Sequence, residues 1–153
     1  MTAQIAGALD RVLAMTVEFA HLRVQFGKSI DQFQMVKSHL AELAAEAGVA
    51  AAAAGSAATV LASGPPSDIA QTAVLAARVR AAQAATTATR LAHQVHGAMG
   101  ITREHPLHVL TGLLWSLRDT GATEAQAQLQ LGRRLVAGGA DTFLRSLLCG
   151  ASD

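Results

Sequence analysis

Apolar side chains recur every three or four residues along the first part of the chain, with polar positions between them. The stripe consists of Ile5, Leu9, Val12, Leu13, Thr16, Phe19 and Leu22. This spacing places one side of an α-helix toward a core. It predicts a helix from Thr2 to Phe26 that ends at Gly27. Residues 29–32 then read as a short connection, in which Ser29 or Asp31 would cap the next helix.

Two longer helical segments follow this connection. The first runs from about Phe33 to Leu61, and residues 63–68 end it with a glycine and two prolines. The second runs from about Ile69 to Val95, with Ser67 or Asp68 as its N-cap. Three helices of about 25 residues would each span roughly 37 Å at 1.5 Å per residue. These proportions predict an elongated bundle.

Shorter elements are expected in the rest of the chain. Two glycines, Gly97 and Gly100, interrupt the helical pattern and permit backbone conformations that other residues resist. The three later helices are predicted from Glu104 or His105 to about Asp119, from Thr123 to Ala137 and from Thr142 to Leu148. The fold class is therefore all-α, an up-and-down bundle of long helices with short C-terminal helices, in one domain covering residues 1–153.

Composition supports this fold and excludes several classes of partner. Apolar residues make up 51% of the chain, but it has four Phe, one Trp and no Tyr, so Ala, Leu and Val must build the core. The net charge of +1 gives no case for nucleic acid. The alanine tract Val49–Ala54 is far shorter than the ~20 apolar residues of a membrane span. With no secretory signal and a single cysteine, Cys149, we expect a soluble cytoplasmic protein.

Chemistry is expected first at the junction of the first two helices. The sequence Arg23-Val-Gln-Phe-Gly-Lys28 is followed closely by Gln32-Phe-Gln34. An arginine fork, aromatic rings and amide side chains suit the pyrophosphate, adenine and ribose of a dinucleotide. A structural reading fits the same residues: Phe26 and Phe33 would staple two helices, and Arg23 would be a solvated cation at a helix end. On the pattern alone, the structural reading is the stronger one.

Resemblance to a known family changes this balance. The segment from Arg23 to Gln34 resembles the motif of acyl-CoA dehydrogenases at the same helix junction. About seventy residues later, Gln94-Val-His-Gly-Ala-Met-Gly100 and then Thr102-Arg-Glu-His-Pro106 resemble the family's glycine-containing segment and its Glu-x-Pro. The chain therefore resembles the C-terminal α-helical domain of that family over nearly its whole length.

The resemblance implies a partial FAD site. The first motif would contact the pyrophosphate and adenine side of an FAD bound mainly by a neighbouring subunit, and the second would approach the adenosine end across the subunit interface. The implied contact residues are Arg23, Phe26, Gln34, Gln94, Gly97 and Ala98. Ala98 stands where a second glycine is usual in the family.

No catalytic residue can be carried over from the family. Its reaction removes a proton alpha to a thioester and passes a hydride from the beta carbon to the flavin, so a carboxylate must take the proton. The family's glutamate falls at Gly121 when residues are counted without gaps, or at Thr120 when the local glycine is matched. Asp119 and Glu124 flank the position, but a displacement of a few residues is too large to assume reactive geometry.

Three functions remain open after these comparisons of pattern. The chain is a C-terminal domain or subunit of an FAD-dependent acyl-CoA dehydrogenase acting on an acyl-CoA, a non-catalytic partner that lacks the base, or a helical oligomerisation module. We expect a homodimer, a homotetramer or a hetero-oligomer with a dehydrogenase subunit, and an inactive isolated chain. We expect no metal site, because the histidine pairs 93/96 and 105/108 lack further ligands in a zinc-binding pattern.

Overall fold

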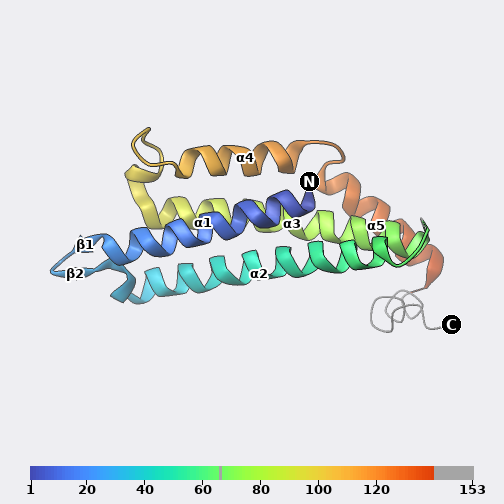
Figure 1. The fold of residues 1–153 in the computed structure, drawn as a ribbon, viewed down its shortest axis with the longest axis horizontal. Coiled ribbons are helices and arrows are strands. Elements are labelled where there is room, and N and C mark those ends of the chain that lie inside the picture. Colours follow the sequence, from blue (N-terminus) through green and yellow to red (C-terminus); the bar gives the residue numbers. More distant parts are fainter. Residues whose placement is uncertain (66, 140–153) are drawn as a thin grey trace.

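Three long antiparallel helices run side by side along the length of the molecule (Figure 1). The structure is a computed structural model that describes residues 1–65 and 67–139. The long helices are α1 (Thr2–Leu22), α2 (Gln34–Ala62) and α3 (Asp68–His96). Two shorter helices, α4 (Leu107–Asp119) and α5 (Glu124–Gly138), pack mainly on α1 and α3. The predicted all-α, up-and-down bundle is confirmed.

Short elements join the helices at one end of this bundle. They are the strands β1 (Val24–Gln25) and β2 (Lys28–Ser29) and the 3-10 helices η1 (Ile30–Gln32) and η2 (Gly97–Gly100). Figure 1 places the hairpin, the end of α3 and the start of α4 at the left, and the α2–α3 link and the α4–α5 turn at the right. The molecule therefore has two distinct ends, separated by the length of the long helices.

The core is built from leucines, a few other aliphatic side chains and many alanines. Leu43 of α2, Leu91 of α3 and the α4 residues Leu107 and Leu114 are fully buried together with Ile5 of α1. Burying each leucine contributes roughly 1.5–3 kcal/mol to stability. Alanines fill the seam between the long helices, because their small side chains let helix backbones approach closely. The shortage of aromatic residues in the sequence is thus explained by close helix packing.

The first helix ends earlier than the predicted Phe26. Arg23 already has extended backbone angles, with φ −79° and ψ 116°, and Val24 and Gln25 leave the helix to pair with β2. The predicted cap of the second helix was also wrong. Phe33 occupies the N-cap position without a side-chain hydrogen bond, and the Asp31 carboxylate is instead bonded to neighbouring side chains.

The later helix starts agree better with the sequence. The Ser67 hydroxyl accepts a hydrogen bond from the Ala70 amide at 3.1 Å and so caps α3 as expected. Thr123 caps α5 in a reciprocal arrangement with Gln126. The fourth helix begins at Leu107, slightly later than predicted, because Pro106 forms its N-cap. The predicted helix 142–148 and Cys149 lie outside the described residues.

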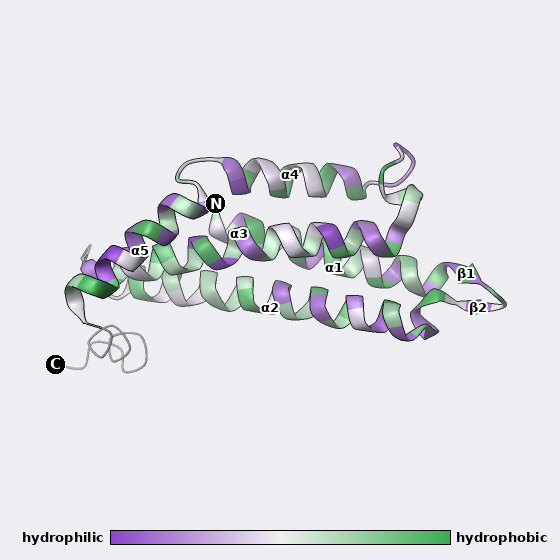
Figure 2. Cartoon of the chain, turned by 180° about the vertical axis from the view of Figure 1, so that it is seen from behind, coloured by the Kyte–Doolittle hydropathy of each residue, from purple (hydrophilic) through white to green (hydrophobic). Residues whose placement is uncertain are grey.

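Helix α2 is unusually apolar for its exposure. Among the described residues it is the one helix that is long and apolar enough to cross a membrane by length and composition alone. It packs against α1 and α3, and core helices of soluble proteins pass the same test. Figure 2 shows hydrophilic residues in its first half and the pale green of weakly apolar residues in its second half. The absence of a membrane span stays a prediction.

Candidate functional site

A tight hairpin projects from the end of α1. Val24 pairs with Ser29 and Gln25 with Lys28, so that Phe26 and Gly27 form a two-residue turn. Both turn residues have positive φ angles, 51° for Phe26 and 78° for Gly27. A type I′ turn requires this backbone and matches the twist of the two strands. The local sequence therefore makes a hairpin where helical periodicity alone predicted a continuing helix.

The residue at the tip of this hairpin is held in a conformation that it disfavours. A bulky residue with positive φ is uncommon, and the left-handed conformation costs roughly 1–2 kcal/mol. Phe26 gains little packing in return, since 93% of the residue is exposed. Local strain of this kind persists mainly at functional positions. An exposed aromatic ring on a strained turn therefore suggests a binding surface.

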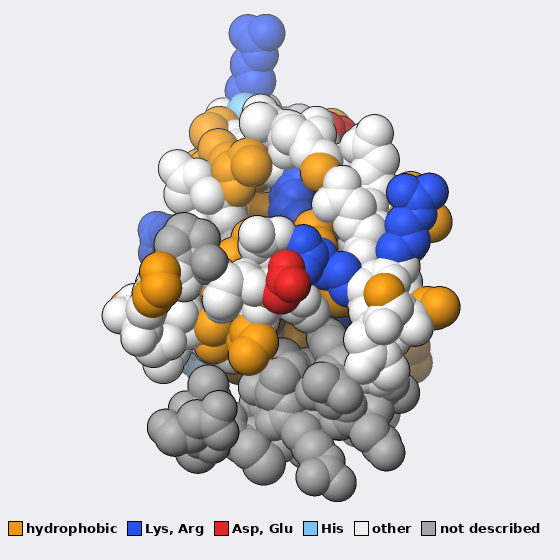
Figure 3. Space-filling view, turned by 90° about the vertical axis from the view of Figure 1, so that its right-hand side faces the viewer, with side chains coloured by type: hydrophobic (Ala, Val, Ile, Leu, Met, Phe, Trp, Pro, Cys, Tyr) orange, Lys and Arg blue, Asp and Glu red, His pale blue; other side chains and the backbone are white. Residues whose placement is uncertain are grey.

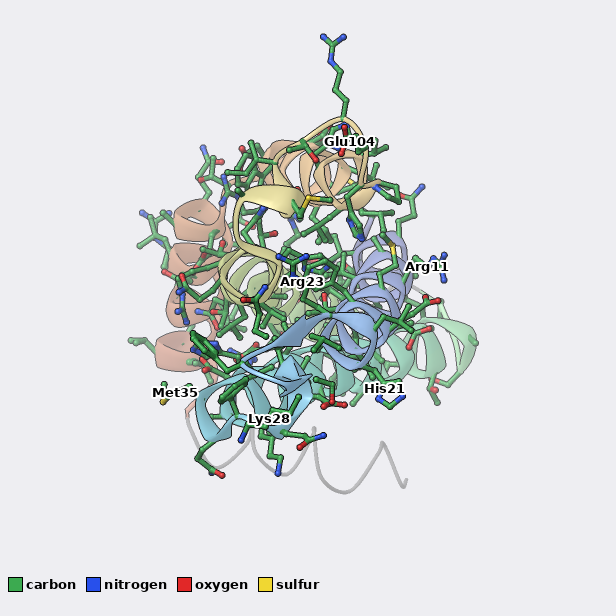
Figure 4. All side chains as sticks on the ribbon, turned by 90° about the vertical axis from the view of Figure 1, so that its left-hand side faces the viewer. Arg11, His21, Arg23, Lys28, Met35 and Glu104 are labelled. Atoms are coloured by element: carbon green, nitrogen blue, oxygen red, sulfur yellow. The ribbon has the colours of Figure 1, made fainter. Side chains whose placement is uncertain are left out.

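Neighbouring side chains form a small aromatic and basic cluster around Phe26. The ring of Phe33 meets that of Phe26 edge to face, with centroids 6.2 Å apart. The Lys28 ammonium lies 4.4 Å from the centroid of the Phe33 ring. Figure 4 looks onto this end of the bundle and shows Arg23 and Lys28 beside the hairpin. Aromatic faces and positive charges together favour an anionic ligand that carries a flat ring.

The base of the hairpin is fixed by its own hydrogen bonds. The Ile30 amide donates to the Arg23 carbonyl at 2.8 Å. The Asp31 carboxylate accepts from the Ser29 hydroxyl at 2.5 Å and contacts His21 Nδ1 at 3.0 Å. The hydrogen bond from Ser29, followed by that from His21, lowers the pKa of Asp31 below its ordinary value. Asp31 thus anchors the hairpin and stays ionised at neutral pH.

Arg23 also borders a cavity of about 420 Å³ beside α1. The cavity is lined by Arg11, Met15, Glu18, Phe19, Leu22, Arg23, His105 and Pro106. Its walls combine apolar side chains with two arginines and one glutamate. The Arg23 residue is exposed and forms no ion pair within the described part of the chain. Its guanidinium is therefore available to a ligand or to another protein surface.

The second motif lies where α3 ends. Gly97 ends the helix with φ 58° and ψ −141°, which is a backbone region open essentially to glycine alone. Gly100 is needed for space, because an added Cβ would lie 3.0 Å from the His96 Cβ and 3.1 Å from a Leu107 methyl group. Gln94, Gly97 and Ala98 are all exposed. The two glycines therefore shape a surface turn beside the last residues of α3.

Side-chain packing brings the two motifs to the same end of the bundle. Phe19 of α1 stacks on His96 of α3, with ring centroids 4.3 Å apart and planes 25° from parallel. Val95 packs with Ala20 and Ile30 in a second small core. All six predicted contact residues are exposed: Arg23, Phe26, Gln34, Gln94, Gly97 and Ala98. Two motifs about seventy residues apart in sequence thus lie at the same end of the molecule. Their binding role stays a prediction.

Buried histidines support this end, and sequence reasoning did not assign them a partner. His96 is 4% exposed, and its Nδ1 donates to the Ala92 carbonyl at 2.8 Å. Its Nε2 has no hydrogen-bond partner among the residues that the structure describes. His105 lies against it with ring centroids 4.6 Å apart. Burial lowers the pKa of His96, and also that of His93, whose Nε2 lies 3.1 Å from the Thr111 hydroxyl. The His96 ring is thus a buried group beneath the glycine turn, and burial favours the neutral form of both His96 and His93.

The opposite end holds the α4–α5 turn, which the family resemblance aligns with a catalytic carboxylate. Gly121 has φ 78° there, a conformation that disfavours glutamate. Arg118 binds both oxygens of Asp119 at 2.8 and 3.1 Å, and this hydrogen bonding lowers the pKa of Asp119. Glu124 accepts hydrogen bonds from Gln83 and Gln128. Asp119 is therefore paired with Arg118, and Glu124 is tied to two amide side chains; the lack of a catalytic residue stays a prediction.

Comparison with known proteins supplies a further set of findings. The family description "acyl-CoA dehydrogenase, C-terminal domain" matches residues 1–116. Acyl-CoA dehydrogenase IpdE2 of Mycobacterium tuberculosis is 38% identical over 109 residues, which are 71% of this chain and 32% of that protein. The chain therefore spans about a third of the length of this curated relative.

Solved structures share the same helical arrangement. Butyryl-CoA dehydrogenase from Megasphaera elsdenii has a TM-score of 0.81 and 26% identity, over 88% of this chain and 34% of that one. The ChsE4–ChsE5 complex from Mycobacterium tuberculosis has a TM-score of 0.73 and 28% identity, over 88% of this chain and 36% of that one. The likeness thus extends from sequence motifs to the path of the backbone.

Proposed function

The chain belongs to the acyl-CoA dehydrogenase family, and from this premise we propose that it completes an FAD site held mainly by another domain or subunit. The observation that carries the proposal is the hairpin tip. Phe26 is strained, exposed and flanked by Arg23 and by the ring of Phe33. Gln94 and Gly97 are exposed at the same end of the bundle, which supports the proposal. A positive charge beside exposed aromatic rings suits a ligand that has phosphates and an adenine ring.

Each residue has a distinct part in this proposal. The planar Arg23 guanidinium donates in pairs to pyrophosphate oxygens. The Phe26 ring offers a face to adenine, while Gln34 and Gln94 supply amide hydrogen bonds to ribose or base edges. Gly97 allows the cofactor to approach the backbone. Bound FAD would accept a hydride from an acyl-CoA thioester in the assembled enzyme.

The exposure of these residues makes assembly a condition for the function. Typical cofactor sites bury most of the ligand surface, whereas Phe26 projects almost entirely into solvent. A cofactor held by this surface alone would remain largely in water. We therefore propose a homodimer, a homotetramer or a hetero-oligomer with a dehydrogenase subunit. A cytoplasmic location is part of this proposal.

Reconstitution with the remaining dehydrogenase domains or with a dehydrogenase subunit tests the proposal. The assembled wild type should take up FAD stoichiometrically, as measured by flavin absorbance and fluorescence quenching. Arg23→Met should weaken FAD binding by roughly 10–100-fold, because a hydrogen bond to a charged group contributes about 1.5–3 kcal/mol. Arg90→Met is the matched control, since Arg90 is an exposed arginine paired only with Glu42 at 3.5 Å. Equal FAD affinity of the two variants would instead favour a helical oligomerisation module unrelated to flavin.

A second candidate is a non-catalytic partner whose complex takes its base from another chain. The α4–α5 turn favours this role, because Asp119 is paired with Arg118 and Gly121 occupies the aligned position. One structural neighbour, at 28% identity, is itself the ChsE4–ChsE5 complex. Asp119→Asn and Glu124→Gln should each leave the turnover of the complex within about twofold. Loss of turnover in either single variant would show that this chain supplies the base.

A further inference from the structure

A buried arginine lies beneath the α4–α5 turn and contacts it from another helix. Arg78 sits in α3 and is 6% exposed. One terminal nitrogen donates to the Leu117 carbonyl at 3.1 Å. The other donates to the carbonyls of Thr120 at 3.0 Å and Ala122 at 3.3 Å, and also to that of Arg118. One guanidinium therefore holds four backbone carbonyls that are 39 to 44 residues away in sequence.

Backbone dipoles, rather than a carboxylate, balance this buried charge. Arg78 forms no ion pair within residues 1–65 and 67–139. Its acceptors include the last carbonyls of α4, which carry the negative end of the helix dipole and lack partners inside the helix. A planar fork with several N–H groups suits a ring of carbonyls better than a single ammonium does. The arrangement resembles a cation held in a cage of carbonyl oxygens.

The outer side of the turn has little else to fix it. Thr120, Gly121 and Ala122 are all exposed. The Thr120 hydroxyl bonds back to the Ser116 carbonyl of α4, which is a local contact that cannot set the turn against α3. Figure 3 looks onto this end of the bundle, where basic side chains are more prominent than acidic ones. Arg78 is thus the side chain that binds the backbone carbonyls of the turn to α3, while Arg118 and Glu124 on its flanks bond to the α3 side chains Thr86 and Gln83.

We propose that Arg78 is a positioning residue that sets the α4–α5 turn against the acyl-CoA in the assembled enzyme. The inference rests on the proposed function, because by resemblance the family's glutamate, which takes the proton alpha to the thioester, falls at Thr120 or Gly121 of this turn. It assigns Arg78 no contact with substrate. The residue acts through the carbonyls of the turn, and a displacement of about 1 Å in such a turn is enough to change rates by about a hundredfold.

The location of Arg78 makes this role separable from FAD capture. The hairpin and the glycine turn lie at the other end of the bundle (Figure 1). Arg78→Met should therefore leave FAD uptake by the reconstituted enzyme unchanged. The Kd for an acyl-CoA, read from the perturbation of the flavin absorbance, should rise about tenfold or more. Arg78→Lys keeps the charge but loses the fork, so its Kd for the acyl-CoA should lie between those of the wild type and Arg78→Met.

A matched control separates this effect from a general loss of an arginine. Arg80 lies two residues away on α3 and pairs at the surface with Glu46 at 3.3 Å. Arg80→Met should leave both the FAD uptake and the acyl-CoA Kd close to those of the wild type. Where Arg78→Met does not fold, as judged by circular dichroism, Arg78→Gln replaces it because glutamine retains two N–H donors.

Amide hydrogen exchange on the isolated chain tests, without any cofactor, whether Arg78 holds the backbone of the α4–α5 turn. We call this contact the Arg78 clamp. Removal of the Arg78 fork should speed exchange at residues 117–123 and leave the hairpin unchanged. Unchanged exchange at the turn would overturn the clamp. Faster exchange with a wild-type acyl-CoA Kd would overturn the positioning role. A wild-type assembly that takes up no FAD would overturn the proposed function, and with it the role toward acyl-CoA, while the exchange result still stands.

Discussion

Replacing Phe26 by asparagine should stabilise the isolated chain and weaken its proposed contact with the cofactor. The left-handed backbone at Phe26 costs roughly 1–2 kcal/mol for an ordinary side chain, and asparagine tolerates it much better. The opposing loss is the edge-to-face contact with Phe33, which lies at or below the low end of about 0.5–1.5 kcal/mol because Phe26 is so exposed. The relief of backbone strain is the larger effect, so Phe26→Asn should raise the free energy of unfolding by about 0.5–1 kcal/mol.

Thermal and urea unfolding of the isolated chain measure this balance. A gain of about 0.5–1 kcal/mol corresponds to a rise in Tm of roughly 1–4 °C for a chain of this size. Phe26→Asn should show that rise. Phe26→Ala should not, because alanine loses the aromatic contact and keeps most of the left-handed strain. A Tm for Phe26→Asn equal to or below that of Phe26→Ala would refute the argument from strain.

Both variants should bind FAD more weakly than the wild type in the reconstituted enzyme, including the variant that is more stable. Stacking of a base on an aromatic side chain contributes about 1–3 kcal/mol. Phe26→Asn and Phe26→Ala should therefore both weaken FAD binding by about tenfold or more. Met35→Ala is the control, since Met35 is another exposed apolar residue near the hairpin (Figure 4). Equal FAD affinity of the Phe26 variants and the Met35 variant would show that the Phe26 ring does not bind the cofactor, whatever the strain in its backbone.

Three further predictions concern the core and the buried histidines. Leu91→Ala should lower the free energy of unfolding by roughly 2–5 kcal/mol in urea titrations, because Leu91 is fully buried; exposed Val136→Ala should change it by less than about 0.5 kcal/mol. Gly100→Ala should cost about 1–3 kcal/mol in the same assay, since its Cβ would meet the His96 Cβ at 3.0 Å. Burial lowers the pKa of His96 below 6.5, so the unfolded chain binds protons first and stability should fall as pH drops below about 6.5. His96→Phe should flatten this fall; an unchanged pH slope would exclude His96 as its source.

The long helices were predictable from sequence because their signals are local and repeated. The stripe from Ile5 to Thr16 marks one buried side of α1, although Leu22 at its predicted end is 70% exposed. Ser67 supplies a cap at the start of α3. The hairpin was missed for a physical reason. Each of its strands has only two residues, too few for alternation to show, and a Phe-Gly turn lacks the usual asparagine or aspartate signal.

The residues of the candidate site could be proposed from the sequence, but the side chains that pack beneath them could not. The motif residues Arg23, Phe26 and Gln94 were named from the resemblance to the family, although only the fold places them at one end. The stack of Phe19 on His96 joins side chains that are 77 positions apart, and no local pattern predicts such a contact. Trp115 of α4 shows the same limit, because this large apolar side chain is 47% exposed and lies outside the core.

The apolar surface of α2 has a consequence for synthesis of the chain. On the ribosome α2 is complete before α3, the helix that covers much of it, has been made. At about 5–20 residues per second, residues 63–96 take several seconds to translate. During that interval a 29-residue apolar helix is a target for chaperones and for membrane-targeting factors. Yield of the protein should therefore depend on translation speed and on chaperone supply more than its folded stability indicates.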